Sequence, residues 1–247
     1  MTRTMTCVVA IALLAAIASR ATADDDAAIK TLVDKAVKAA GGAEKLEKFN
    51  AATWSEKGTY HGTGTALPYD GQYAMQYPDH FRMEIKGVFV LLLAGDKGWT
   101  KSPEGVKDFT KEQVTEQREQ QHAGWLTAKL HKLHDKKNKL TLTGETKVAD
   151  RPAIGLKVSS EGYRDVTMYF DKESNLVVRV DHVVRSEELG GKEVNQEMTA
   201  SNHKEIDGIM HPMKVVINRD GKVFVEAEME NLKLVDKLPD GTFSKPE

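Results

Sequence analysis

Cysteine is almost absent from this sequence of 247 residues, which contains only Cys7. Cys7 opens an apolar stretch, Cys7–Ile17, that follows Arg3 and is too short to span a bilayer. An Ala-Thr-Ala tripeptide ending at Ala23 then matches the cleavage site of a secretory signal peptide. We therefore expect residues 1–23 to be a signal peptide cleaved after Ala23. The product would be periplasmic, or secreted if the cell has no outer membrane. The mature chain would then have no thiol for a disulfide, a thiolate metal site or a nucleophile.

Several motifs and charge patterns are missing as well. A formal net charge of −2, with no basic run interleaved with aromatics, gives no basis for nucleic-acid binding. The sequence has no G-x-S-x-G elbow and no H-E-x-x-H zinc motif. His131 and His134 could share a helical face, but no third ligand is evident and lysines surround them. We therefore predict a protein that is not an enzyme, needs no metal or cofactor and binds no nucleic acid.

Helical patterns occur in only three places. Apolar residues from Ile29 to Ala40 recur at helical spacing and end at Gly41-Gly42, which predicts an amphipathic helix. A short second helix is expected over about 43–49. The third, over about 110–134, has a weak apolar stripe and a largely polar surface.

The rest of the sequence alternates with a period of two, as strands do. An early example is Trp54, Glu56, Gly58 and Tyr60, which alternate with polar or small residues. Turn signals rich in glycine and aspartate separate such segments every 10 to 14 residues or so, which favours antiparallel hairpins. We count about eleven strands and no linker. We therefore expect residues 24–247 to form a single, mainly β (α+β) domain.

So many alternating strands present more apolar face than three short helices can cover. Either the sheet folds into a filled sandwich, or it curls into an open barrel with a cavity. The segment Val88–Ala94 is apolar on both faces, which suits a central core strand or a strand that lines an apolar pocket. The tyrosines of the early strands could place their hydroxyls at the rim of such a pocket.

Six short segments carry motifs of a known protein family. Two come early: Pro78–Arg82 (PDHFR) and Gly95–Trp99 (GDKGW), separated by the apolar strand. The later ones are Tyr169–Asp171 with Leu176–Arg179, then Asp207–Pro212 and Gly241–Pro246. Together with the signal peptide, the first helix and the double glycine, these segments resemble the LolA-like family of periplasmic lipoprotein-sorting proteins.

The resemblance implies an open antiparallel half-barrel with covering helices, whose apolar concave face holds acyl chains. The function it implies is a periplasmic carrier or sensor of a lipid or of lipoprotein acyl chains. The residues it places near the cavity are Tyr73, Tyr77, Phe81, Met83, Ile85, Phe89, Val90, Leu91, Leu92, Leu93 and Trp99, with Arg82 at a lid or rim. The sequence does not decide which of Leu92 and Leu93 points inward.

One departure concerns the lid. Studied carriers of this family have an arginine immediately before the motif proline, where this sequence has Tyr77. A second hypothesis therefore stands beside the carrier: a non-catalytic envelope module that has the same fold and a filled cavity, and that binds a protein partner. The implied partners are a lipid or lipoprotein, an envelope protein and, transiently, a membrane surface.

Overall fold

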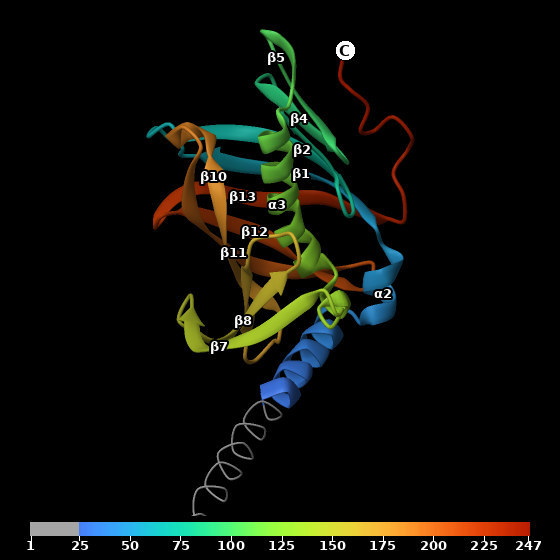
Figure 1. The fold of residues 1–247 in the computed structure, drawn as a ribbon, viewed down its shortest axis with the longest axis vertical. Coiled ribbons are helices and arrows are strands. Elements are labelled where there is room, and N and C mark those ends of the chain that lie inside the picture. Colours follow the sequence, from blue (N-terminus) through green and yellow to red (C-terminus); the bar gives the residue numbers. More distant parts are fainter. Residues whose placement is uncertain (1–24) are drawn as a thin grey trace, which may run out of the picture.

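The computed structural model describes residues 25–247, so the predicted signal peptide lies outside the described residues. Thirteen strands in this range form one antiparallel sheet in the order β6-β5-β4-β3-β2-β1-β13-β12-β11-β10-β9-β8-β7. The edge strands β6 and β7 do not pair with each other, so the sheet curls but stays open (Figure 1). The strands are β1 (Ala51–Tyr60), β2 (Leu67–Gln76), β3 (His80–Ile85), β4 (Phe89–Ala94), β5 (Lys97–Ser102), β6 (Gly105–Asp108), β7 (Asn138–Val148), β8 (Arg151–Ser160), β9 (Val166–Asp171), β10 (Val177–Ser186), β11 (Lys192–Ile206), β12 (Ile209–Arg219) and β13 (Lys222–Val235).

The open antiparallel sheet predicted from the sequence is confirmed, with a few more strands than expected. The β5–β6 hairpin accounts for most of the difference. Its two segments, KGWTKS and GVKD, contain one large apolar residue each, so they show no alternation that sequence analysis could detect.

The helices lie where the sequence predicts them. Residues 25–40 are helical, and α2 (Ala43–Lys48) follows them. The long helix α3 (Lys111–Ala128) begins with a capping box, in which Thr110 and Gln113 satisfy each other's backbone N–H groups. It ends earlier than predicted and gives way to a short 3₁₀ helix, η1 (Leu130–Lys132). A second 3₁₀ turn, η2 (Glu187–Leu189), connects β10 to β11.

One half of the sheet carries a filled core. Most inward side chains of β8, β9 and β10 are buried against the 25–40 helix, the second half of α3 and η1. Leu126, Leu156, Met168 and Phe170 have no exposed surface at all. Each large apolar side chain removed from water in this way contributes roughly 1.5–3 kcal/mol, so this region stabilises the fold.

The outer face of β2 to β5 is covered by the segment that follows β13. Leu238 packs against Ala51 and Ala74, and Phe243 lies edge-on to the His80 ring. Figure 1 shows this C-terminal segment running beside β4 and β5. Ala51, Ala74 and Leu238, with Val235 and Phe243 packed against them, therefore form a second small core on that side of the sheet.

Candidate functional site

The inner face of β2, β3 and β4 collects seven of the residues predicted to bind lipid. Cross-strand pairs join Phe81 to Leu93, Met83 to Leu91 and Ile85 to Phe89, and Tyr73 of β2 pairs with Met83. Side chains alternate between faces along a strand, so all members of these pairs share one face. We call Tyr73, Phe81, Met83, Ile85, Phe89, Leu91 and Leu93 the inner wall.

Four other predicted residues have the opposite parity and lie on the outer face. Arg82 pairs across the sheet with Leu92, which in turn pairs with Trp99. The guanidinium of Arg82 donates to the carboxylate of Glu84 at 2.6 Å, on the side of the sheet away from the inner wall. The fourth is Val90, the neighbour of Leu91 in β4.

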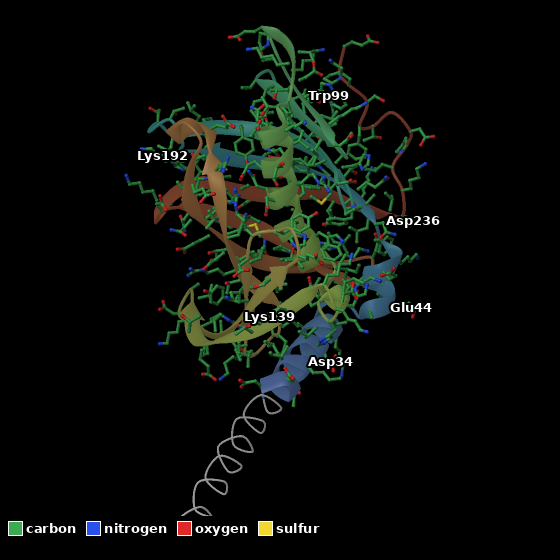
Figure 2. All side chains as sticks on the ribbon, in the orientation of Figure 1. Asp34, Glu44, Trp99, Lys139, Lys192 and Asp236 are labelled. Atoms are coloured by element: carbon green, nitrogen blue, oxygen red, sulfur yellow. The ribbon has the colours of Figure 1, made fainter. Side chains whose placement is uncertain are left out.

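Trp99 connects the outer face to the C-terminal segment. Its indole and the Lys245 ammonium both hydrogen-bond the carboxylate of Asp108. Figure 2 labels Trp99 near this segment. Leu92 and Trp99 are therefore buried by outer-face packing. Tyr77, in the turn between β2 and β3, is anchored by its backbone N–H, which donates to the Asn50 carbonyl at 2.9 Å.

Most of the inner wall retains some exposed surface. Met83, Ile85, Phe89 and Leu91 are half-buried, in contrast to the fully buried inward residues of β8 to β10. The wall continues across the sheet in the same state. Its further half-buried apolar residues are Trp54 on β1, Met229 and Val225 on β13, Ile217 on β12 and Met198 on β11. The concave face is thus filled at one end and accessible at the other.

Helix α3 crosses the concave face and covers part of it (Figure 1). Near its start, Val114 packs against Phe81 and Leu93. Two residues further, the buried Glu116 accepts a hydrogen bond from the Arg185 backbone N–H at 2.8 Å and another from the Arg164 guanidinium at 2.9 Å. The first half of α3 is therefore attached to the far side of the sheet by polar contacts.

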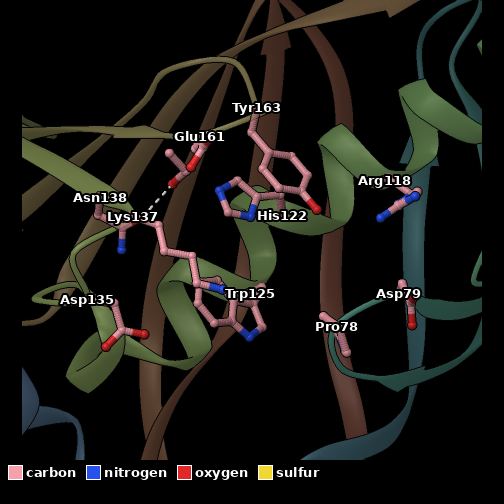
Figure 3. Close-up of a pocket in the computed structure, with 11 residues that line it drawn as sticks. Pro78, Asp79, Arg118, His122, Trp125, Asp135, Lys137, Asn138, Glu161 and Tyr163 are labelled. Carbon is pink, nitrogen blue, oxygen red and sulfur yellow. Dashed lines mark hydrogen bonds between the residues drawn. The ribbon is translucent and has the colours of Figure 1, made fainter.

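A cleft of about 200 Å³ opens beside α3 (Figure 3). The Tyr163 ring stacks on the His122 ring, with centroids 3.8 Å apart. The Trp125 ring is also stacked with His122, at a centroid distance of 5.7 Å. Pro78 and Asp79 lie across the cleft from this stack. The rest of the lining is Arg118 of α3, residues 135, 137 and 138, and the turn between β8 and β9. None of the predicted site residues lines this cleft.

His122 is held neutral by its surroundings in the cleft. It is only 9% exposed, and burial lowers its pKa to about 4. Its Nε2 atom is buried and has no hydrogen-bond partner in the described chain. The ring therefore acts as part of an aromatic stack.

Sequence analysis missed one polar residue on the accessible face. Glu56 shares its face with Trp54 and lies between β2 and β13. Its carboxylate accepts from the Trp54 indole at 2.8 Å and from the Tyr69 hydroxyl at 3.2 Å. The alternation from Trp54 to Tyr60 contained the signal, because it placed an acid on an otherwise apolar face.

The histidines with helical spacing are paired with acids. His131 contacts the Glu47 carboxylate at 2.6 Å, and His134 lies 4.0 Å from Asp34. Within residues 25–247 no group of three or more histidine, cysteine, aspartate or glutamate side chains is arranged to hold a metal ion. No helix in the same range has both the length and the apolar character needed to cross a membrane.

Comparison with solved structures identifies the fold. No protein-family model and no curated protein matches the sequence. Among solved structures, a LolA superfamily protein from Nitrosomonas europaea aligns with a TM-score of 0.57 and 13% identity over 87% of this chain and 97% of its own. A DUF1329 family protein from Desulfovibrio piger gives 0.56 and 14% over 87% and 96%. A putative outer membrane lipoprotein-sorting protein domain from Vibrio parahaemolyticus gives 0.53 and 12% over 86% and 97%. The chain therefore has the LolA-like fold that its sequence motifs resemble.

Proposed function

We propose that this protein binds the acyl chains of a lipid or lipoprotein on its concave face and acts as their carrier or sensor. The observation that carries the proposal is the accessible part of the concave face. It consists of the inner wall on β2–β4 and the half-buried apolar residues of β1 and β11–β13, which stay partly exposed beneath α3. A filled core would have buried these side chains, as it does on β8 to β10. The LolA-like fold supports this assignment, because one neighbour is described as a lipoprotein-sorting domain.

Binding would be a reversible partition of hydrocarbon from water onto the inner wall. Each methylene removed from water contributes roughly 0.8 kcal/mol, so a chain of 16 carbons supplies about 10 kcal/mol before ordering costs. The bound chain would displace α3 from part of the wall or enter beside it. This activity requires no catalytic group and no cofactor. It also fits a mature chain that begins after Ala23 and works in the periplasm as one domain.

Exposed apolar residues at one end of the sheet support a brief membrane contact during ligand transfer. Four large apolar residues are more than 40% exposed, and strand direction puts all of them at the same end of the sheet. They are Leu67, Val88, Leu189 and Val223. Exposed lysines stand close by in the chain at 86, 192 and 222. Apolar tips beside positive charge suit brief contact with an anionic bilayer surface.

Two neighbouring residues of β4 provide a matched test. Leu91 lies on the inner wall and Val90 on the outer face, and both are half-buried. We expect Leu91→Gln to weaken binding of a palmitoyl lysophospholipid about tenfold or more, because a polar amide then contacts the chain. Val90→Gln should leave the affinity within about twofold. Titration calorimetry measures both, and circular dichroism checks the fold.

Two results would contradict the carrier proposal. Equal affinity of both folded variants would show that the inner wall is not the site. No binding of any lysophospholipid by the unmodified protein would favour the alternative, an envelope module that binds a protein partner.

A further inference from the structure

The one acidic side chain that faces inward among the aromatic residues of β1 and β2 is Glu56. The Trp54 indole donates to its Oε1 and the Tyr69 hydroxyl to its Oε2, and the Tyr73 hydroxyl is a third hydrogen-bonding partner. Trp54 and Tyr73 are themselves stacked, with ring centroids 5.1 Å apart and planes 7° from parallel. The carboxylate is therefore fixed in position by three aromatic side chains.

These three donors are all neutral. Within residues 25–247 no lysine, arginine or histidine forms an ion pair with Glu56. A carboxylate has about four acceptor positions, so at least one remains for a further donor. Its half-burial raises the pKa of Glu56, because no cation offsets the loss of hydration. An acid in this state is stabilised by an incoming positive charge.

The surroundings suit a particular charge. The Trp54 and Tyr73 rings stack on each other and direct their N–H and O–H groups at the carboxylate, so the carboxylate itself would attract a protonated amine through a charge-assisted hydrogen bond. On β13, Met229 pairs with Glu56 across the strands, and Gly71 of β2 pairs with it on the other side. The polar site is thus bordered by the same half-buried apolar wall that would hold an acyl chain. A headgroup at β1 and a chain along β2–β4 would occupy one continuous surface.

We propose that Glu56, with Trp54, Tyr69 and Tyr73 around it, binds the protonated amine of the ligand's headgroup. The ligand class is then an amphiphile with a primary ammonium group and an acyl chain. This inference rests on the proposed function, since the acyl chain delivers the amine to the site. The amine supplies the specificity that an apolar wall lacks, because the wall itself distinguishes ligands mainly by chain length.

The test compares two ligands that differ only at the amine. They are palmitoyl lysophosphatidylethanolamine and its N-acetyl derivative, measured against the purified protein by titration calorimetry below their aggregation concentrations. We expect the amine to bind at least about tenfold more tightly, as a hydrogen bond to a charged group provides. Glu56→Gln should reduce that ratio to about one and leave binding of the acetylated ligand unchanged. Glu228→Gln, which removes the same charge from the exposed outer face of β13, should keep the ratio.

Tyr69→Phe serves as a second variant that keeps the carboxylate. It removes one of the three donors, so the preference for the amine should persist in it. Equal binding of both ligands by the unmodified protein would overturn the amine site and leave acyl-chain binding intact. A preference that survives Glu56→Gln would overturn it too. Failure of both ligands to bind would overturn the proposed function itself, and the amine site with it.

Discussion

The attachment of α3 can be tested at Glu116. Its carboxylate accepts from the Arg185 backbone N–H at 2.8 Å and from the Arg164 guanidinium at 2.9 Å. Hydrogen bonds to charged groups contribute about 1.5–3 kcal/mol each, but Arg164 is 26% exposed and water replaces part of its interaction. We therefore expect Glu116→Ala to lower the free energy needed to detach the first half of α3 from the sheet by about 2–3 kcal/mol. That corresponds to a roughly 30- to 150-fold larger open population.

Hydrogen exchange followed by mass spectrometry measures this opening. Amides in the first half of α3, around Glu116, should exchange faster in Glu116→Ala, while amides of the second half of α3 and of β8 and β9, which belong to the filled core, should change much less. Glu193→Ala is the graded control, because Glu193 meets Arg164 at 3.4 Å and is 56% exposed. Its effect should stay below about 1 kcal/mol. If amide exchange speeds up equally in the first half of α3 and in the filled core, this explanation is wrong, because Glu116 would then stabilise the whole fold and not only the attachment of α3.

Two further predictions follow from burial and exposure. Burial lowers the pKa of His122, His182 and His211 to about 4, so each should stay neutral in the folded protein at neutral pH. In the unfolded chain each takes up a proton near pH 6.5, so each should lower the folding stability by up to about 3 kcal/mol as the pH falls from 6.5 toward 4. Thermal unfolding across that range should show the loss, and His182→Gln should remove about a third of it, because the other two histidines remain; a melting temperature constant from pH 6.5 to 4.5 would contradict the burial argument. Val88→Asp, at an exposed turn, should reduce co-sedimentation with anionic vesicles severalfold without altering lysophospholipid affinity, whereas unchanged sedimentation would remove that turn from the membrane-facing end.

Local patterns were enough to predict the sheet and the helices. Alternation identified most strands, and the stripe from Ile29 to Ala40 identified the first helix. The same reasoning could not orient β4, because its residues are apolar on both faces. Leu93 faces α3 while Leu92 faces outward, and both are fully buried, because the distant C-terminal segment packs on the outer side of the same strands.

Long-range polar contacts were beyond the sequence. Arg164 and Glu116 are 48 residues apart, and neither belongs to a local motif. The partners of Glu56 are easier to see in retrospect, since Tyr69 and Tyr73 lie on β2, the strand that follows β1 after a turn and pairs with it. Recognising them required the register of that hairpin, in which Glu56 stands opposite Gly71 and between the two tyrosines.

The position of a bound acyl chain is the central claim, and photolabelling tests it most directly. A palmitoyl lysophospholipid with a diazirine along its chain would be bound to the protein, illuminated and mapped by peptide mass spectrometry. The account predicts labels on the inner wall, at Met83 and Leu91 above all, and on the facing side of α3. Labels confined to outer-face residues such as Val90, or to the exposed turns, would contradict it.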